Sequence, residues 1–220
     1  MKLKIILTGA TGMVGEGVLH ECLFHSDVEQ VLVINRKACD VKHSKLKEII
    51  HSDFLNLSAI ENQLIGYNAC FFCAGVSAIG MKEEEYNRLT YILTLHVAET
   101  LCRHNPELTF CYISGAATDS SEKGRSMWAR VKGKTENALM RLPFKKAYNF
   151  RPGYMHPTPG MKNTLSYYKY LGWMYPFFRK VFPNFVSTLS ELGLAMIHAA
   201  SKGYHKQILE VKDIVALSKK

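Results

Sequence analysis

The first fifteen residues constrain this chain most, because an apolar run, a glycine-rich turn and a helical pattern follow one another without a gap. The apolar run ends at Leu7, and Gly9, Gly12 and Gly15 follow it at a spacing of three residues. In a dinucleotide-binding βαβ unit the first glycine permits the tight turn, the second lets the backbone approach a pyrophosphate, and the third lets helix and strand pack closely. Unpaired N–H groups of the first helical turn would hold the phosphates. A turn with only a structural role needs one glycine, so the spacing favours a nucleotide site.

The rest of the chain alternates between short apolar runs and helical patterns. We expect further parallel strands, in chain order, at 31–36, 46–50, 69–73, 109–113 and 146–150, and a last edge strand at 207–211. This alternation predicts the α/β class, a doubly wound parallel sheet of the Rossmann type with a small C-terminal helical cap. We expect a single nucleotide-binding domain over 1–220, with the cap over 154–206 inserted before the last strand.

Composition narrows the possible partners. The net charge is +9, from 28 basic and 19 acidic residues, but the basic residues are spread in twos and threes, so we expect no nucleic-acid partner.

No apolar run is long enough to span a membrane, and the N-terminal apolar run is too short for a signal peptide. Cys70 and Cys73 lie three apart on a predicted strand and would point to opposite faces. We therefore expect a cytoplasmic protein without a metal site.

The end of the second predicted strand bears on the choice of cofactor. An acidic residue at this place would accept a hydrogen bond from the free 2′-hydroxyl of NAD. The chain has Asn35 and Arg36 there instead. A cation attracts a 2′-phosphate and no carboxylate repels it, so the sequence favours NADP, with NAD possible.

Two later strand ends add candidate cofactor contacts. Asp53 follows the third predicted strand and could accept a hydrogen bond from the adenine amino group, or equally cap the turn that leads to 57–59. Ala74 and Gly75 follow the fourth strand, where small residues let the backbone lie against a cofactor.

A second informative region begins at the fifth strand. Ser114 ends that strand and Lys132 lies on the following helix, and both are expected to face the nicotinamide side. With the motif Thr8-Gly-x-x-Gly-x-x-Gly15 and the run Arg151-Pro152-Gly153, these residues resemble the short-chain dehydrogenase/reductase superfamily in its extended or atypical branch. Within it the chain looks most like the small NAD(P)-binding oxidoreductase group of the Tat-interacting protein, also described as NAD-dependent epimerase/dehydratase-like. The resemblance is good over residues 2–153 and looser after that.

The resemblance implies a tyrosine four residues before Lys132, which would act as general acid and base while the lysine lowers its pKa and holds the ribose. Trp128 occupies that position. An indole N–H only donates and cannot cycle a proton near neutral pH. The proton therefore comes from Tyr112, Tyr154 or His156, it comes from water, or there is no turnover.

Two functional hypotheses follow. The first is an oxidoreductase that moves hydride between NADP(H) and a small carbonyl-type substrate, with Ser114 orienting the substrate and Lys132 holding the ribose. The second is a catalytically silent module that senses NADP(H) or binds a protein partner. A homo-oligomer is possible in either case. The candidate catalytic positions are Ser114, Lys132 and Trp128. The candidate cofactor-binding residues are Thr8, Gly9, Thr11, Gly12, Met13, Val14, Gly15, Arg36, Asp53, Phe54, Cys73, Ala74, Gly75, Ser114, Lys132, Arg151 and Pro152.

The region after Gly153 is short and aromatic. Residues 165–186 hold nine aromatic side chains. They could form a substrate lid, a partner surface or a membrane-surface contact, but prolines interrupt any long amphipathic helix, so a small packed appendage is favoured. Only 67 residues (220 minus 153) follow Gly153, which makes a nucleotide-sugar substrate less favoured.

Overall fold

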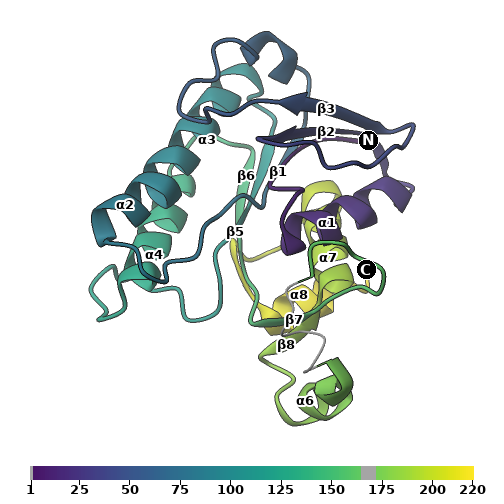
Figure 1. Ribbon diagram of the computed structural model, residues 1–220, viewed down its shortest axis with the longest axis vertical. Helices are drawn as coiled ribbons and strands as arrows, with labels where there is room; N and C mark the ends of the chain where they lie inside the picture. Colours follow the sequence, from purple (N-terminus) through teal and green to yellow (C-terminus); the bar gives the residue numbers. More distant parts are fainter. Residues whose placement is uncertain (1, 165–171) are drawn as a thin grey trace.

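The protein is built on one parallel sheet. The computed structural model describes residues 2–164 and 172–220. The strands of the sheet are β1 (Leu3–Thr8), β2 (Val28–Asn35), β3 (Leu46–Ile50), β4 (Ala69–Phe72), β5 (Thr109–Ile113), β6 (Lys146–Arg151) and β9 (Ile208–Glu210). Their order across the sheet is β3-β2-β1-β4-β5-β6-β9, and all pairings are parallel (Figure 1). β1 pairs with β2 on one side and with β4 on the other, and the chain crosses back over the sheet from β3 to reach β4. Ligands of open α/β sheets bind at such a reversal, beyond the carboxyl ends of the strands.

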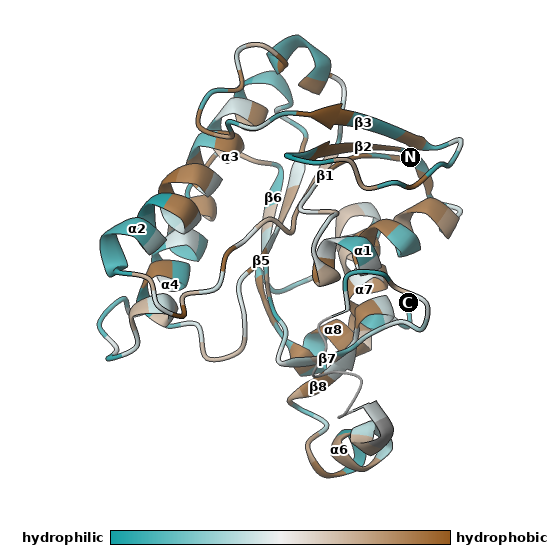
Figure 2. Cartoon of the chain, in the orientation of Figure 1, coloured by the Kyte–Doolittle hydropathy of each residue, from teal (hydrophilic) through white to brown (hydrophobic). Residues whose placement is uncertain are grey.

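Both faces of the sheet are covered by helices. One face packs against α1 (Met13–Phe24), α7 (Leu189–Lys202) and α8 (Val211–Leu217), and the other against α3 (Leu93–His104) and α4 (Met127–Leu139). Side chains alternate between the faces, so in β1 Ile5 and Leu7 join the α1 side while Ile6 joins the α3 side. All three are fully buried, which explains why the strand reads as a continuous apolar run. Figure 2 shows α7 mostly in brown, as expected for a helix in the core.

The helical spacing of the apolar residues Leu89, Ile92, Leu93, Val97 and Leu101 predicts one long helix from residue 82, but this segment is not a uniform α-helix. It consists of α2 (Glu83–Asn87), a π-helical turn at Arg88–Ile92 and α3. A π turn holds more residues than an α turn, so it shifts the phase of the apolar stripe. Ile92, which the helical period assigned to the buried face, is 46% exposed, whereas Thr90 is buried. The prediction was therefore wrong at this position.

The C-terminal part contains a smaller layer. Strands β7 (Tyr154–His156) and β8 (Val186–Thr188) form a two-stranded parallel sheet, and η3 (Gly172–Met174) and α6 (Tyr175–Val181) lie between them in sequence. In Figure 1 α6 lies well away from the main sheet. Residues 165–171 of the aromatic segment lie outside the described part of the chain. Helix α7 falls within the range expected for the cap, but it packs on α1 and the main sheet.

Candidate nucleotide-binding site

The turn between β1 and α1 requires two of its three glycines for steric reasons. Gly9 has a φ of +77°, in the left-handed region, and an added Cβ there would lie 2.7 Å from the Ala74 nitrogen. A Cβ on Gly15 would lie 2.1 Å from the Gly9 carbonyl oxygen, so only glycine allows the helix to approach the turn. A Cβ on Gly12 would meet only the Gly9 oxygen, at 3.5 Å. Gly12 therefore leaves open space in front of the helix, where a pyrophosphate would fit.

The start of α1 is suited to an anion. Gly12 is the N-cap residue and has no side chain to accept from the first turn. The N–H groups of Met13 and Val14 belong to that turn, in which helical N–H groups have no carbonyl partner within the helix. The helix dipole adds positive potential at the same place. These residues, with the exposed Thr11 beside them, fit the diphosphate of a dinucleotide without any charged side chain.

A buried asparagine connects this turn to the loop after β2. Asn35 is 3% exposed, and its Oδ1 accepts from the Ala10 N–H at 3.1 Å. Its Nδ2 donates to the Glu48 carboxylate at 3.4 Å, and the same carboxylate oxygen accepts from the Cys39 N–H at 2.9 Å. The sequence marked Asn35 only as a missing carboxylate. In the structure it positions the glycine turn relative to the residues that follow β2.

The side chains of several predicted cofactor-contact residues make contacts within the fold. Thr8 is fully buried, and its Oγ1 accepts from the Ala74 N–H at 3.3 Å. Asp53 accepts from the Leu55 N–H at 2.9 Å, which is the turn-capping alternative. Phe54 is 8% exposed and packs in the core on the α3 side. Any cofactor contact of these residues would use the backbone or the free carboxylate oxygen of Asp53.

Small residues follow the carboxyl ends of β4 and β6. Cys73 packs on the α1 side of the sheet and Cys70 on the opposite side, as their spacing predicted. Gly75 follows Cys73 and is exposed, and an added Cβ there would meet no atom within 4 Å. The Pro152 carbonyl accepts from the Ala116 N–H at 2.8 Å, which holds the loop after β5 against the end of β6.

A polar cavity of about 620 Å³ adjoins the glycine turn. It extends from Thr11 to the loop that follows β2, and a segment after β7 also contributes to its lining. The lining residues are Thr11, Arg36, Lys37, Ala38, Cys39, Asp40, Lys162 and Asn163. Arg36, which the sequence selected for a 2′-phosphate, thus faces the same space as the glycine turn.

On the other side of the reversal, Ser114 is engaged with a buried carboxylate. Glu136 of α4 is completely buried, and the Ser114 hydroxyl donates to its Oε1 at 2.5 Å. Arg151 donates to the same carboxylate through Nε at 3.0 Å and through Nη2 at 2.5 Å. A hydroxyl has a single hydrogen. In this arrangement Ser114 cannot also donate to a substrate oxygen, as the resemblance had implied.

Lys132 lies directly next to this group. Its Nζ donates to the Ser114 carbonyl, and more weakly to the Ile113 carbonyl at 3.5 Å. An ammonium has three N–H donors, so one is left for a ligand. Burial lowers the pKa of Lys132 to about 8, with Glu136 opposing that shift. Lys132 is still mostly cationic at pH 7.

The structure narrows the choice of proton donor. Tyr112 is 2% exposed, burial raises the pKa of its phenol, and the Lys132 ammonium lies 6.0 Å from its ring centre. A buried phenol of raised pKa cannot reach a substrate, so this candidate is wrong. Trp128 lies in the first turn of α4, partly buried, with its ring edge next to the backbone of Gly115.

The other two candidates lie in the small C-terminal layer. The His156 ring stacks on Tyr175 with 4.1 Å between ring centres, and burial lowers the pKa of His156. The ring of Tyr154 lies 6.5 Å from that of Phe178 of α6. Both side chains are partly buried and contact residues of α6.

The sequence reasoning missed Glu136, although a signal was present. Glu136 lies four residues after Lys132, so both project from one face of α4. A carboxylate one turn beyond the lysine, together with Arg151 at the end of the neighbouring strand, could have indicated a buried ion pair. No pattern in the sequence indicated a role for Lys162, because it lies in a loop without regular secondary structure.

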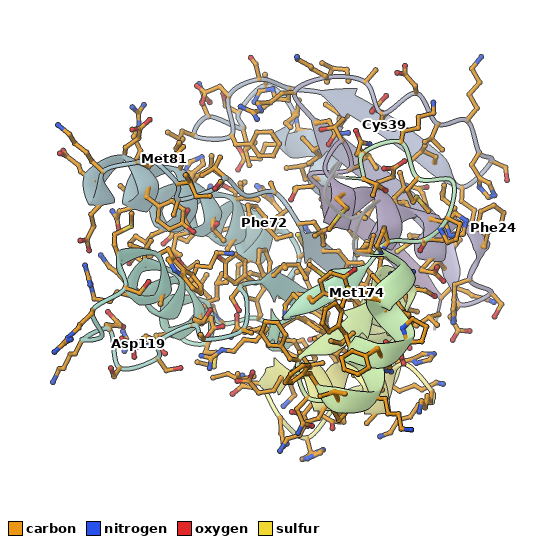
Figure 3. All side chains as sticks on the ribbon, turned by 60° about the horizontal axis from the view of Figure 1, so that its bottom comes forward. Phe24, Cys39, Phe72, Met81, Asp119 and Met174 are labelled. Atoms are coloured by element: carbon orange, nitrogen blue, oxygen red, sulfur yellow. The ribbon has the colours of Figure 1, made fainter. Side chains whose placement is uncertain are left out.

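The two parts of the site follow strands on either side of the reversal between β1 and β4. The loop after β2 lines the polar cavity and Ser114 follows β5, and β1 and β4 lie between these two strands in the sheet. Figure 3 shows Cys39, from the loop after β2, and Asp119, from the loop between β5 and α4, with Phe72 of β4 between them in this view. An elongated ligand that crosses the reversal between β1 and β4 would contact both.

Solved structures share this fold. MoeE5 in complex with UDP-glucose and NAD matches with a TM-score of 0.66 and 15% identity, over 98% of this chain and 80% of that one. The ADP-L-glycero-D-manno-heptose-6-epimerase of Helicobacter pylori matches with a TM-score of 0.66 and 15% identity, over 99% and 82%. WbmF of Bordetella bronchiseptica, in complex with NAD+, matches with a TM-score of 0.67 and 14% identity, over 99% and 77%. At these identities the likeness shows a shared fold and no more.

The curated relatives overturn one expectation. "Protein FMP52-2, mitochondrial" of Scheffersomyces stipitis is 28% identical over 156 residues, which cover 70% of this chain and 66% of that protein. "Protein FMP52, mitochondrial" of Meyerozyma guilliermondii is 26% identical over 69% of this chain and 64% of that protein. The chain thus spans slightly less than two thirds of these relatives. Their names conflict with the expected cytoplasmic location, which is withdrawn. Within residues 2–164 and 172–220, no helix has the length and apolarity needed to cross a bilayer.

The family itself is identified by the amino-terminal part of the chain. The sequence model of the NAD dependent epimerase/dehydratase family matches residues 5–126, which is more than half of the 220 residues. The match includes the glycine turn, the loop after β2 and Ser114, and it ends just before α4. This chain therefore belongs to the NAD dependent epimerase/dehydratase family.

Proposed function

We propose that this protein binds NADP(H) at the carboxyl edge of its sheet and transfers hydride between it and a small carbonyl-type substrate. The observation that carries the proposal is the glycine turn, open at Gly12 and uncapped at α1, directly beside a cavity that contains Arg36. An uncharged phosphate cradle next to a cation suits a dinucleotide with an additional phosphate on its adenosine ribose. The solved structures in complex with NAD support the same class of cofactor.

The preference for NADP over NAD rests on Arg36. We expect Arg36→Ala to weaken NADPH binding about 10- to 100-fold, because a hydrogen bond to a charged group contributes about 1.5–3 kcal/mol. NADH lacks the 2′-phosphate, so its affinity should change less than twofold. Isothermal titration calorimetry of both nucleotides with both proteins measures this difference. Equal losses for NADPH and NADH would remove the assignment of Arg36 to the 2′-phosphate.

The chemistry would occur beside Lys132. The bound nicotinamide would donate or accept the hydride. Lys132 would hold the nicotinamide ribose through its third N–H, which donates to neither the Ser114 nor the Ile113 carbonyl. Trp128 cannot supply a proton, and Tyr112 is buried. The rings of Tyr154 and His156 pack against residues of α6. Among the remaining sources we assign the proton to water, which makes turnover slower than in relatives with a tyrosine at this position.

A silent NADP(H) sensor remains the second candidate. It is favoured by Trp128 and by the Ser114 hydroxyl, which already donates to Glu136. NADPH oxidation against a panel of small aldehydes and ketones, in the wild type and in Lys132→Ala, separates the two functions. Slow oxidation that the variant loses supports the enzyme. Tight NADPH binding with no oxidation of any panel member supports the sensor.

A further inference from the structure

The cavity beside the glycine turn is richer in positive charge than the sequence indicated. Arg36 and Lys37 come from the loop after β2, and Lys162 comes from the segment after β7, more than 120 residues later. Asp40 is the one carboxylate residue among the lining residues. Within the described part of the chain, none of the three cations forms an ion pair. Three like charges without internal partners are a favourable setting for an anionic ligand.

The segment that carries Lys162 is fixed to the helix that begins the nucleotide site. Both carboxylate oxygens of Glu16, in the first turns of α1, accept from backbone N–H groups: Oε1 from Lys162 at 2.8 Å and Oε2 from Asn163 at 2.7 Å. Pro157 and Pro159 restrict the backbone of the same segment. In Figure 1 this green loop runs alongside the purple α1. The position of Lys162 is thus set by contacts that do not involve its own side chain.

We propose that Lys162 supplies a third cation for the 2′-phosphate of NADP(H), and that Glu16 is the positioning residue that keeps it there. The inference rests on the proposed function, because it concerns the adenosine end of the same site. Arg36 and Lys37 line the cavity from the loop after β2, and Lys162 lines it from the segment after β7. Glu16 does not line the cavity, and its carboxylate accepts hydrogen bonds from the loop backbone. The C-terminal layer would in this way take part in the choice of cofactor.

The direct test is nucleotide binding by Lys162→Ala in the full chain. Removing one charge-assisted contact at an exposed site should weaken NADPH and adenosine 2′,5′-bisphosphate by about 10-fold. NADH should change less than twofold, and Lys162→Arg should retain most of the NADPH affinity. Lys180→Ala is the matched control, because Lys180 is an exposed lysine on α6 outside the cavity. It should bind all three ligands like the wild type.

The positioning role of Glu16 is tested by a double-mutant cycle with Lys162, read out as NADPH affinity. Glu16→Ala should weaken NADPH by a factor similar to that of Lys162→Ala, and the double variant should be no weaker than Lys162→Ala alone. Independent, multiplying losses would overturn the positioning role. Lys162→Ala with wild-type NADPH affinity, or with equal losses for NADH and NADPH, would overturn the third-cation role. A wild type that binds neither nucleotide would instead refute the proposed function itself.

Discussion

Replacing Trp128 by tyrosine should raise the rate of NADPH-dependent carbonyl reduction by about 10²- to 10⁴-fold, the usual contribution of a positioned general acid. Residues 128 and 132 are one helical turn apart on α4, so a phenol at 128 would lie on the same helix face as the Lys132 ammonium. That ammonium is mostly charged at pH 7, because burial lowers the pKa of Lys132 only to about 8. A nearby cation favours the phenolate and lowers the pKa of a tyrosine. Steady-state NADPH oxidation at saturating carbonyl substrate measures the gain.

Trp128→Phe is the control for this experiment. It also removes the indole, but it brings no hydroxyl, so any gain from a larger substrate space would appear in both variants. The increase in Trp128→Tyr should also disappear when Lys132 is replaced by methionine. If Trp128→Tyr binds NADPH like the wild type and still shows no increase, the oxidoreductase assignment fails and the silent sensor is supported.

Glu136→Gln should lower the free energy of unfolding by about 3 kcal/mol, the lower end of the cost of breaking a buried ion pair from one side. Glu136 is completely buried, and its carboxylate accepts from Ser114 and twice from Arg151. The substitution leaves the Arg151 guanidinium with a neutral amide. Arg151 keeps a contact with Glu210 at 3.2 Å, which limits the loss. Urea denaturation at pH 7 measures the change, and a fall in Tm of about 6–12 °C should accompany it.

Glu210→Gln provides the matched comparison because it removes a second carboxylate from the same arginine. The Glu210 side chain is 46% exposed, so its loss should cost less than about 1 kcal/mol. A similar cost for both variants would mean that burial does not set the strength of these pairs. Losses of stability in Glu136→Gln without any change in NADPH affinity would place the residue in the scaffold alone.

The strands of the main sheet could be predicted because each is marked by residues that are close together in the sequence, whereas β7 and β8 of the small layer were not predicted. Thr109–Ile113 has the predicted bounds and is a largely apolar run. Leu46–Ile50 also has the predicted bounds, although it contains the exposed residues Lys47 and Glu48. The edge strand expected at 207–211 is also present, but it stops at Glu210. The sequence there did not reveal α8, which starts at Val211, because a seven-residue helix shows barely two turns of apolar periodicity.

The same distinction between local features and contacts of distant segments applies to the candidate site. The close packing at Gly15 could be predicted because the atom that an added Cβ would meet, the Gly9 carbonyl oxygen, lies six residues away in the chain. The left-handed φ of Gly9 is local as well, whereas the atoms that an added Cβ would meet there belong to Cys73 and Ala74, beyond the end of β4. The Glu136–Arg151 pair and the contact between Glu16 and the Lys162 backbone depend on packing between segments that are distant in sequence. The substrate-orienting role of Ser114 was an expectation from resemblance, and a carboxylate on the neighbouring helix uses the hydrogen that this role requires.

The contacts of Asn35 have a consequence for engineering cofactor preference. The obvious route from NADP to NAD is an aspartate at the end of the second strand, where it would bind the ribose hydroxyls. In this protein the Asn35 amide nitrogen donates to Glu48, so an aspartate would put two carboxylates side by side at about hydrogen-bond distance. An aspartate at position 35 would therefore require that residue 48 be neutralised in the same step.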